Sequence, residues 1–141
     1  MKEIIATAEA PAALGPYAQA VKVNDTIFVS GQLPLHPKNH QMVTGAIGAQ
    51  TEQVLTNIRS ILEEGGAHLN DIVKVTIYMK NLGDFDEMNR VYELFFPNSD
   101  TSTNLLPARS TVEVARLPRD AAIEIDCIAI VTNDYMTPEL F

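Results

Sequence analysis

The chain has 141 residues, of which 46% are apolar, and a formal net charge of −8 at pH 7. We expect one domain over residues 1–131 and a short tail at 132–141, because no Pro/Gly/Ser-rich linker divides the chain. Acidic residues are spread along the sequence and no Lys/Arg run occurs, so the average field repels phosphate backbones and disfavours nucleic-acid partners.

The N-terminus and the cysteine content indicate a cytoplasmic protein. The N-terminal segment holds too short an apolar core for a signal peptide, and no apolar run approaches the ~20 residues of a membrane span. Cys127 is the only cysteine, so the chain can form neither an intramolecular disulfide nor a cysteine-based metal site. We therefore expect a reducing compartment and no membrane partner.

The first half of the chain predicts an early hairpin behind a loop. After an extended start at Ile4 and Ile5, two prolines and a glycine hold Tyr17 in a loop rather than a helix. Apolar and polar residues then alternate on both sides of a turn at Asn24 and Asp25, which is a hairpin signature.

Two segments have the apolar spacing of helices. Residues 47–62 place apolar side chains on one face, and a following glycine pair accepts the left-handed conformation that ends a helix. A second helix is expected between Asp84 and Pro97, with Asp84 and Glu87 forming a capping box. The alternating segment 73–80 between the two helices predicts a strand.

The stretch from Pro107 to Ile130 reads as a second β-hairpin that turns at about residues 117–120. Arg109 stands at the entry to its first run, and Glu124 and Asp126 alternate with isoleucines in the second. A carboxylate among apolar neighbours costs free energy unless it is paired or used, so we expect the chemistry here.

The resulting order of elements, β, β, α, β, α, β, β, predicts an α+β fold in which two helices pack on one face of a mixed sheet. The last strand is partly apolar on both sides, since Ile128 and Ile130 share the side of the carboxylates. Two helices cover one face, so we expect the second face to meet another chain in a closed homo-oligomer.

Five segments of the chain, in order, hold the motifs of one known family. They are GPYAQAV at 15–21, FVSGQLPL at 28–35, AQTEQVLTNI at 49–58, DFDEMNRVY at 84–92 and PARSTVEVARLPRDAAIEID at 107–126. Together they resemble the Rid family, the YjgF-type reactive-intermediate deaminases. The match covers nearly the whole chain, and its last segment is the most specific.

This resemblance implies a chorismate-mutase-like α+β fold and a homotrimer with pockets between subunits. The implied activity is hydrolysis of 2-imino acids, including 2-aminoacrylate, to 2-keto acids and ammonia, with no cofactor. Such imines arise from enzymes that dehydrate serine or threonine. The implied partners are small 2-imino or 2-keto acids and other copies of the chain.

The resemblance also implies residue roles. Arg109, in the PARS motif, would bind the substrate carboxylate, and Glu124, in the IEID motif, would handle the attacking water. The implied pocket-lining residues are Tyr17, Ser30, Gly31, Asn89 and Thr111.

The sequence departs from the family pattern in four places. Ala18 replaces a common serine, and Thr111 stands where many members have cysteine, which argues against dependence on a thiol. The loop before Pro107 and the tail after Val131 are longer than usual. Either segment could change which imines enter the pocket.

The chemistry of imine hydrolysis suits these residue types. A guanidinium presents a planar fork that binds both oxygens of a carboxylate, and a lysine at position 109 would not orient the substrate as well. Burial disfavours the charged form of a carboxyl, which moves its pKa toward the range useful for proton transfer between water and amine.

Each charged residue also has a structural interpretation. Arg109 could be a surface arginine at the start of a strand. Glu124 and Asp126 could pair with Arg116 or Arg119 across the strands or lie in solvent, and we assign this structural role to Asp126.

The polar candidates also have structural interpretations. The predicted hairpin, in addition, places Arg109 and Glu124 far apart. Tyr17 could be a packed loop residue, Ser30 could satisfy backbone groups, and Asn89 could be a surface amide. In the predicted hairpin, Glu124 lies opposite roughly position 113, about 13 Å along the strand from Arg109. Another register, a long side-chain reach or a neighbouring subunit would have to close that gap.

No metal or nucleotide cofactor is expected. His36, His40 and His68 have no spacing that collects ligands on one face. Gly45 and Gly48 do not form a phosphate-binding loop, because neither the strand nor the GK[ST] ending is present.

Three functions therefore compete. Hydrolytic imine deamination is the first, and a non-catalytic oligomer that binds a keto acid or amino acid and regulates a partner is the alternative. RNA cleavage, with which some relatives have been labelled, requires a basic groove that this composition lacks.

Overall fold

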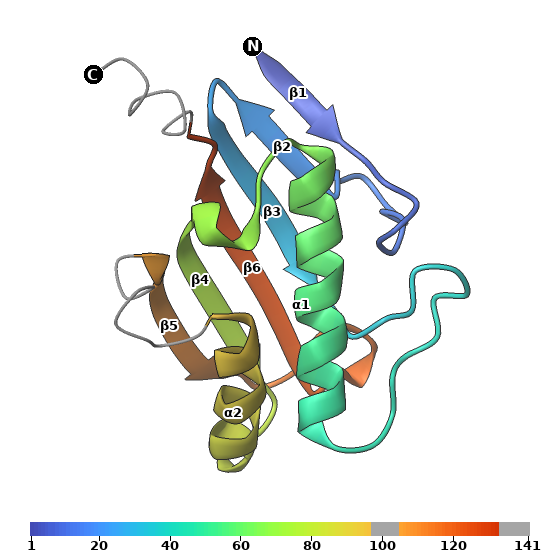
Figure 1. The fold of residues 1–141 in the computed structure, drawn as a ribbon. Helices are drawn as coiled ribbons and strands as arrows, with labels where there is room; N and C mark the ends of the chain where they lie inside the picture. The colour runs from blue at the N-terminus through green and yellow to red at the C-terminus, as the bar shows by residue number, and fades with distance from the viewer. Residues whose placement is uncertain (97–104, 133–141) are drawn as a thin grey trace.

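The computed structural model describes residues 1–96 and 105–132, which form one six-stranded sheet with two helices on one face (Figure 1). The strand order is β1-β2-β3-β6-β4-β5. The predicted α+β class, with both helices on the same face, is confirmed. All but the first residue of the expected tail 132–141 lies outside the described residues.

The elements follow the predicted order with one addition. Their bounds are β1 (Lys2–Ile5), β2 (Ala20–Val23), β3 (Thr26–Gln32), α1 (Ile47–Glu64), β4 (Ile72–Met79), α2 (Phe85–Phe95), β5 (Ala108–Glu113) and β6 (Ile123–Ile130). The extended start is a full strand, β1, that pairs antiparallel with β2. The turn at Asn24 between β2 and β3 is confirmed, with φ of 53° at Asn24.

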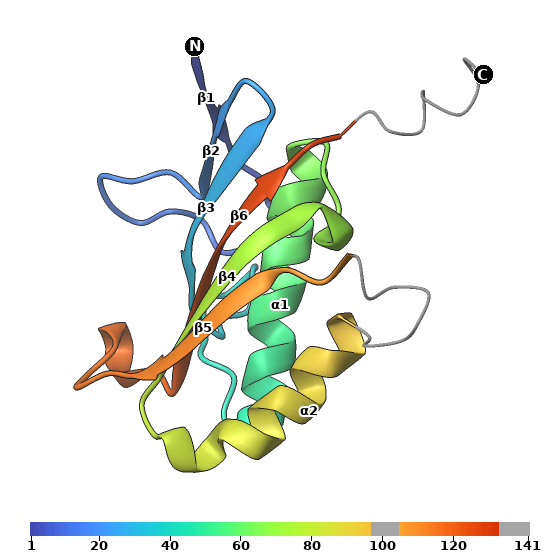
Figure 2. The ribbon, with the colours of Figure 1, turned by 90° about the vertical axis from the view of Figure 1, so that its left-hand side faces the viewer.

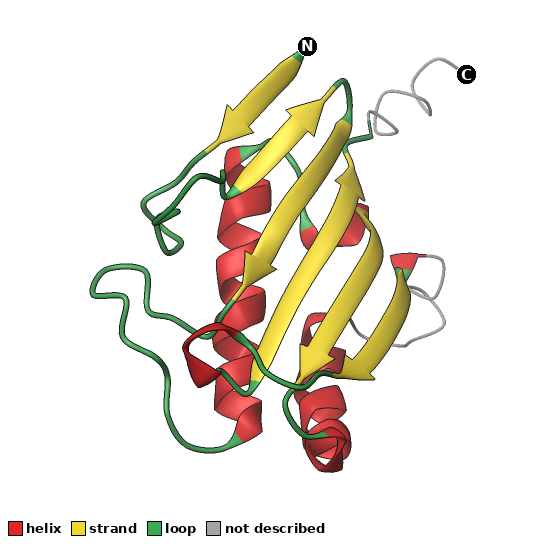
Figure 3. Cartoon of the chain, turned by 180° about the vertical axis from the view of Figure 1, so that it is seen from behind, coloured by secondary structure: helices red, strands yellow, loops and turns green. Residues whose placement is uncertain are grey.

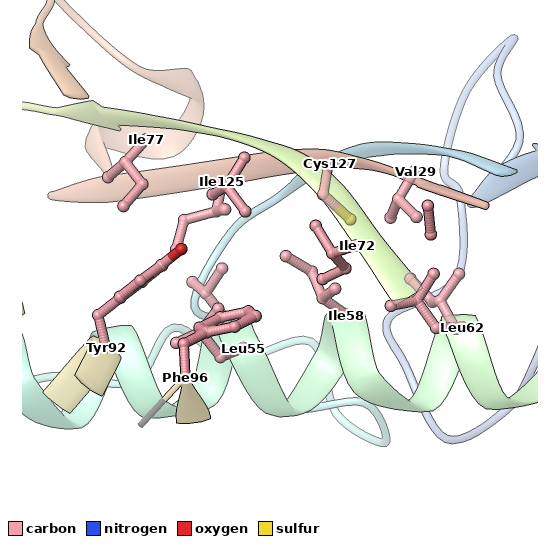
Figure 4. Packing of buried hydrophobic residues seen from close by; sticks show 14 of the residues in the cluster. Val29, Leu55, Ile58, Leu62, Ile72, Ile77, Tyr92, Phe96, Ile125 and Cys127 are labelled. Carbon is pink, nitrogen blue, oxygen red and sulfur yellow. The ribbon is translucent and has the colours of Figure 1, made fainter. Parts of the chain in front are cut away.

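The core lies between α1 and the sheet, as Figure 4 shows. Leu55, Ile58 and Leu62 point from α1 toward the strands, at the spacing that the sequence predicts. They meet Ile125 and Cys127 of β6, and all five side chains are buried. Each aliphatic side chain buried in this way stabilises the fold by roughly 1.5–3 kcal/mol.

The start of α2 differs from the prediction. Asp84 makes no side-chain capping bond, so the expected capping box with Glu87 is wrong. Asp84 lies in a 3-10 turn that runs directly into α2, and with φ of −89° and ψ of 8° it lacks the extended backbone of an N-cap residue. The cap stands earlier, where the Asn81 side chain accepts a hydrogen bond of 2.8 Å from the Gly83 N–H.

The predicted second hairpin is also wrong, because β4 lies between β5 and β6 (Figures 2 and 3). β5 runs parallel to β4 with Arg109 opposite Val75, and β6 runs antiparallel to β4 with Tyr78 opposite Glu124. Residues 114–122 are long enough to step across the end of β4. Alternation along two strands shows which faces they have but not which strand each one pairs with.

The two faces of β6 are as predicted. Ile123, Ile125 and Cys127 are buried under the helices, and Glu124 and Asp126 therefore point to the opposite side. Figure 3 shows that side, which neither α1 nor α2 covers. Paired apolar side chains run across this open face in the cross-strand order Ile4, Val21, Phe28, Ile128.

A matched pair of leucine substitutions tests the core. Leu62→Ala should lower the free energy of unfolding by about 2–5 kcal/mol, because Leu62 is fully buried and the substitution leaves a cavity. Leu94→Ala on α2 should change it by no more than about 0.5 kcal/mol, because Leu94 is 71% exposed. Urea denaturation at one protein concentration measures both, and equal losses would contradict this packing.

Candidate functional site

Arg109 is held in place by α2. Its Nη1 donates a hydrogen bond of 2.7 Å to Asn89 Oδ1. Its guanidinium carbon lies 4.6 Å from the ring centroid of Tyr92 and 5.6 Å from that of Phe85, within the range of cation–π attraction. Asn89 and Tyr92 are three residues apart and share a helix face, so α2 orients the guanidinium from two points.

A small cavity of about 180 Å³ opens beside this guanidinium. It is lined by Asn89, Tyr92, Glu93, Phe96, Leu106, Pro107 and Arg109. No carboxylate of residues 1–96 or 105–132 forms an ion pair with Arg109. Burial raises the pKa of the Tyr92 hydroxyl to about 12, which keeps it neutral. The cavity therefore offers an oriented cation to an anionic ligand.

Thr111 follows Arg109 on the same face of β5, opposite Ile77 of β4. Its Oγ1 is buried and has no hydrogen-bond partner among the described residues. A buried hydroxyl without a partner costs free energy that a ligand or a water could recover. Thr111 is not among the residues that line the cavity beside Arg109, so its pocket-lining role stays a prediction.

Glu124 lies on the open face of β6 against Gly31 of β3. A side chain at Gly31 would overlap the Glu124 carboxylate, so only glycine allows this close approach. Both residues line a cavity of about 380 Å³ together with Tyr17, which is 57% exposed. Three of the residues that the family motifs single out therefore meet in one place.

The carboxyl of Glu124 has a perturbed proton affinity. Burial, and secondly the charge of Asp126, raise the pKa of Glu124 above its ordinary value. Asp126 lies two residues further along the same face and accepts a hydrogen bond of 2.9 Å from the Tyr78 hydroxyl. Of the two structural alternatives for these carboxylates, an ion pair with Arg116 or Arg119 is not found among the described residues.

Ser30 holds the Tyr17 loop rather than facing the cavity. Its Oγ donates a hydrogen bond of 2.6 Å to the Ala18 carbonyl, and its N–H donates one of 2.9 Å to the Gln19 carbonyl. This is the structural alternative for Ser30, and it fixes the segment next to Tyr17 against β3.

The structure thus forms two groups and keeps them apart. Arg109 and Thr111 of β5 lie on the helix-covered face together with Asn89 of α2, and Tyr17, Gly31 and Glu124 lie on the open face. Their strands β5 and β6 are separated by β4, and the side chains of Arg109 and Glu124 point to opposite faces. Neither group holds both the guanidinium and the carboxyl.

Two tyrosines that contact residues of the site were not predicted from the sequence as site residues. Tyr92 could have been found, because it follows Asn89 by one helical turn. Tyr78 could not, because its approach to Asp126 depends on the strand order.

The described residues contain no three His, Cys, Asp or Glu side chains placed to hold a metal ion together. The same part of the chain has no helix with the length and apolar character needed to cross a membrane.

A substitution at Glu124 tests its burial. Glu124→Gln should raise the free energy of unfolding at pH ~8, because the raised pKa means that ionised Glu124 disfavours the folded state. The folded state binds the Glu124 proton more tightly than the unfolded state does. The stability that comes from this proton is therefore complete below the pKa of Glu124 in the unfolded state, and it is lost as the pH rises through the pKa in the folded state.

The gain should therefore shrink toward about pH 4, where wild-type Glu124 is itself protonated. Urea denaturation at a series of pH values measures it, with Glu63→Gln on the exposed side of α1 as the matched control. A Glu124→Gln protein that is less stable than wild type at every pH would refute the assignment.

Known proteins resemble this chain over nearly its full length. The model of the family described as endoribonuclease L-PSP matches residues 7–131. A RutC family protein of Pyrococcus abyssi is 52% identical over 128 residues, 91% of this chain and 96% of its own. The 2-iminobutanoate/2-iminopropanoate deaminase of Escherichia coli is 46% identical over 130 residues, 92% of this chain and 98% of its own.

A solved structure has the same fold as this chain. The crystal structure of E. coli TdcF with bound serine has a TM-score of 0.84 and 38% identity, covering 92% of this chain and 99% of that one. A family match over most of the chain, with identities well above 30%, leaves the assignment clear. The chain belongs to the endoribonuclease L-PSP family, which is the Rid (YjgF) family that its motifs predict.

Proposed function

We propose that the protein is a cofactor-free imine deaminase that hydrolyses 2-imino acids to 2-keto acids and ammonia. The E. coli relative is named for two such imines, 2-iminobutanoate and 2-iminopropanoate, and these are the substrates we propose. The imine and enamine tautomers interconvert, so 2-aminoacrylate would enter as 2-iminopropanoate.

The observation that supports this most is the separation of two complementary half-sites. Arg109 has an oriented guanidinium and no carboxylate partner among the described residues, and Glu124 has a carboxyl with a raised pKa. A 2-imino acid needs both, one for its carboxylate and one for the water. Because the two side chains point to opposite faces, one chain cannot bring them together.

A second subunit can. We propose a chorismate-mutase-like homotrimer in which the edge strand β5 of one subunit lies against the open face of its neighbour, so that Arg109 of the first meets Glu124 of the second. The apolar side chains across the open face, including Phe28 at 48% exposure, favour such burial. A closed ring would contain three equivalent sites and leave no half-site unpaired.

In the proposed mechanism, Arg109 binds both oxygens of the substrate carboxylate and sets the position of the C=N carbon. The imine reacts in its protonated form: a water adds to that carbon while Glu124 accepts one of the water's protons, giving a neutral carbinolamine. Glu124 then returns the proton to the nitrogen. The C–N bond breaks, ammonia leaves, and the remaining hydroxyl proton is lost as the keto group forms.

The other predicted residues shape this site. Thr111 has an unused buried hydroxyl beside Arg109, and Tyr17 would cover the substrate next to Glu124. Asn89 orients Arg109. We place the catalytic unit within residues 1–131, and the protein in the cytoplasm, on the sequence arguments given above.

The alternative is a small-metabolite sensor without turnover. The bound serine in the TdcF structure supports amino-acid binding in a relative. The same two half-sites could hold such a ligand. Ligand-induced thermal stabilisation without turnover would favour this reading. RNA cleavage is disfavoured by the net charge of −8.

Substitutions at Arg109 test the proposed activity. With imine generated by a threonine dehydratase, the wild-type protein should speed the appearance of 2-ketobutyrate. Arg109→Lys keeps the charge but loses the fork, so kcat/KM should fall about 10–100-fold, and Arg109→Ala further. Arg90→Lys on the exposed side of α2 is the matched control and should retain activity. Equal rates with and without wild-type protein would refute the function.

A further inference from the structure

A second carboxylate and a tyrosine stand next to Glu124 on the open face. Glu124 and Asp126 are two residues apart on β6, so their side chains point the same way, about 7 Å apart along the strand. β4 places Tyr78 directly opposite Glu124 and Thr76 opposite Asp126.

The Tyr78 hydroxyl does not bind the residue it faces. It reaches diagonally and donates a hydrogen bond of 2.9 Å to Asp126 Oδ2. Among the described residues no side chain donates a hydrogen bond to Glu124, whose carboxyl stays free for water or substrate. Tyr78 therefore holds one carboxylate still and leaves the other available.

We propose that Tyr78 and Asp126 are positioning residues for Glu124: Tyr78 fixes the Asp126 carboxylate beside Glu124, so that Glu124 keeps its proton until the departing nitrogen takes it. The catalytic part of this inference rests on the proposed imine deaminase function. The placement of the three side chains does not.

The surroundings of Glu124 support a role for Asp126. The titratable or charged groups around it are Asp126 on β6, Tyr78 on β4, Tyr17 in the first loop, His40 in the loop before α1 and Arg119 in the turn before β6. Arg119 donates to the His40 carbonyl at 3.0 Å, so part of its guanidinium is engaged there. The neighbouring β3 contributes the uncharged Ser30 and Gly31.

The net result of these groups is a raised pKa of Glu124, caused first by burial and second by Asp126. Tyr78 shares the environment: burial, and then its hydrogen bond to Asp126, raise the pKa of its hydroxyl. The phenol thus stays a donor over the working range of pH, and a neutral donor holds Asp126 without cancelling its charge.

The first experiment measures the proton affinity directly, without reference to activity. The protein is labelled with glutamate carrying ¹³C at the side-chain carboxyl, and the Glu124 resonance is identified by its loss in Glu124→Gln. Its titration midpoint should move to lower pH in Asp126→Asn and, by a smaller amount, in Tyr78→Phe. Asp120→Asn removes an equal charge from an exposed ion pair with Lys80 and should leave it unmoved.

The second experiment asks whether the shift reaches catalysis. In Asp126→Asn, kcat should fall on the order of tenfold, part of what a proton-transferring group contributes, while KM changes little. The limb of the pH–rate profile that follows Glu124 should move to lower pH with the NMR midpoint. Tyr78→Phe removes only one hydroxyl from a half-buried side chain. It is therefore the variant for the same measurements if Asp126→Asn does not fold.

A Glu124 midpoint that stays in place in both Asp126→Asn and Tyr78→Phe would overturn the inference. So would a fall in kcat without movement of the pH limb, which indicates a merely structural role. If the midpoint moves but wild-type protein hydrolyses no imine, the proposed function fails while the placement of the three side chains stands.

Discussion

The position of β4 between β5 and β6 determines how this protein can work. Because β4 is paired with β5 on one side and with β6 on the other, the connection after β5 must cross the end of β4 before β6 begins. This crossing leaves Arg109 on an edge strand under α2 and puts Glu124 near the middle of the sheet on the opposite face. A hairpin would have put both residues on adjacent strands of one subunit. The observed order separates them, so the proposed function requires a second subunit.

Each half-site is prepared by its own surroundings. Asn89 and the Tyr92 ring fix the guanidinium of Arg109, so little side-chain freedom would be lost when a carboxylate binds. On the other side, Gly31 makes room for the Glu124 carboxyl, and burial with Asp126 adjusts its proton affinity. In the proposed mechanism, the first half-site orients the substrate and the second transfers the proton. Glu124 lowers the stability of the fold when it is ionised, because it is half-buried.

Local patterns in the sequence predicted which face of each helix and strand is buried. They did not predict which strands pair in the sheet. The apolar face of α1 and the alternation of Ile123 and Ile125 with the carboxylates depend only on helix and strand periods, and both predictions are confirmed. The second hairpin is wrong because period alone does not reveal which strand lies next to β6. The hydrogen bond from Tyr78 to Asp126 could not be predicted for the same reason. The residues of each half-site came from family motifs, and their grouping into two came from the fold.

We propose that Arg109 and Glu124 act on one substrate from different subunits. Co-expression of Arg109→Ala and Glu124→Ala chains with different affinity tags, followed by purification on both tags, yields only mixed oligomers. In a cyclic trimer of either mixed composition, one of the interfaces combines an intact arginine with an intact glutamate, so about a third of wild-type activity should return. Each variant alone should be inactive. Mixed trimers as inactive as the parent variants would show that the two residues do not act together across subunits.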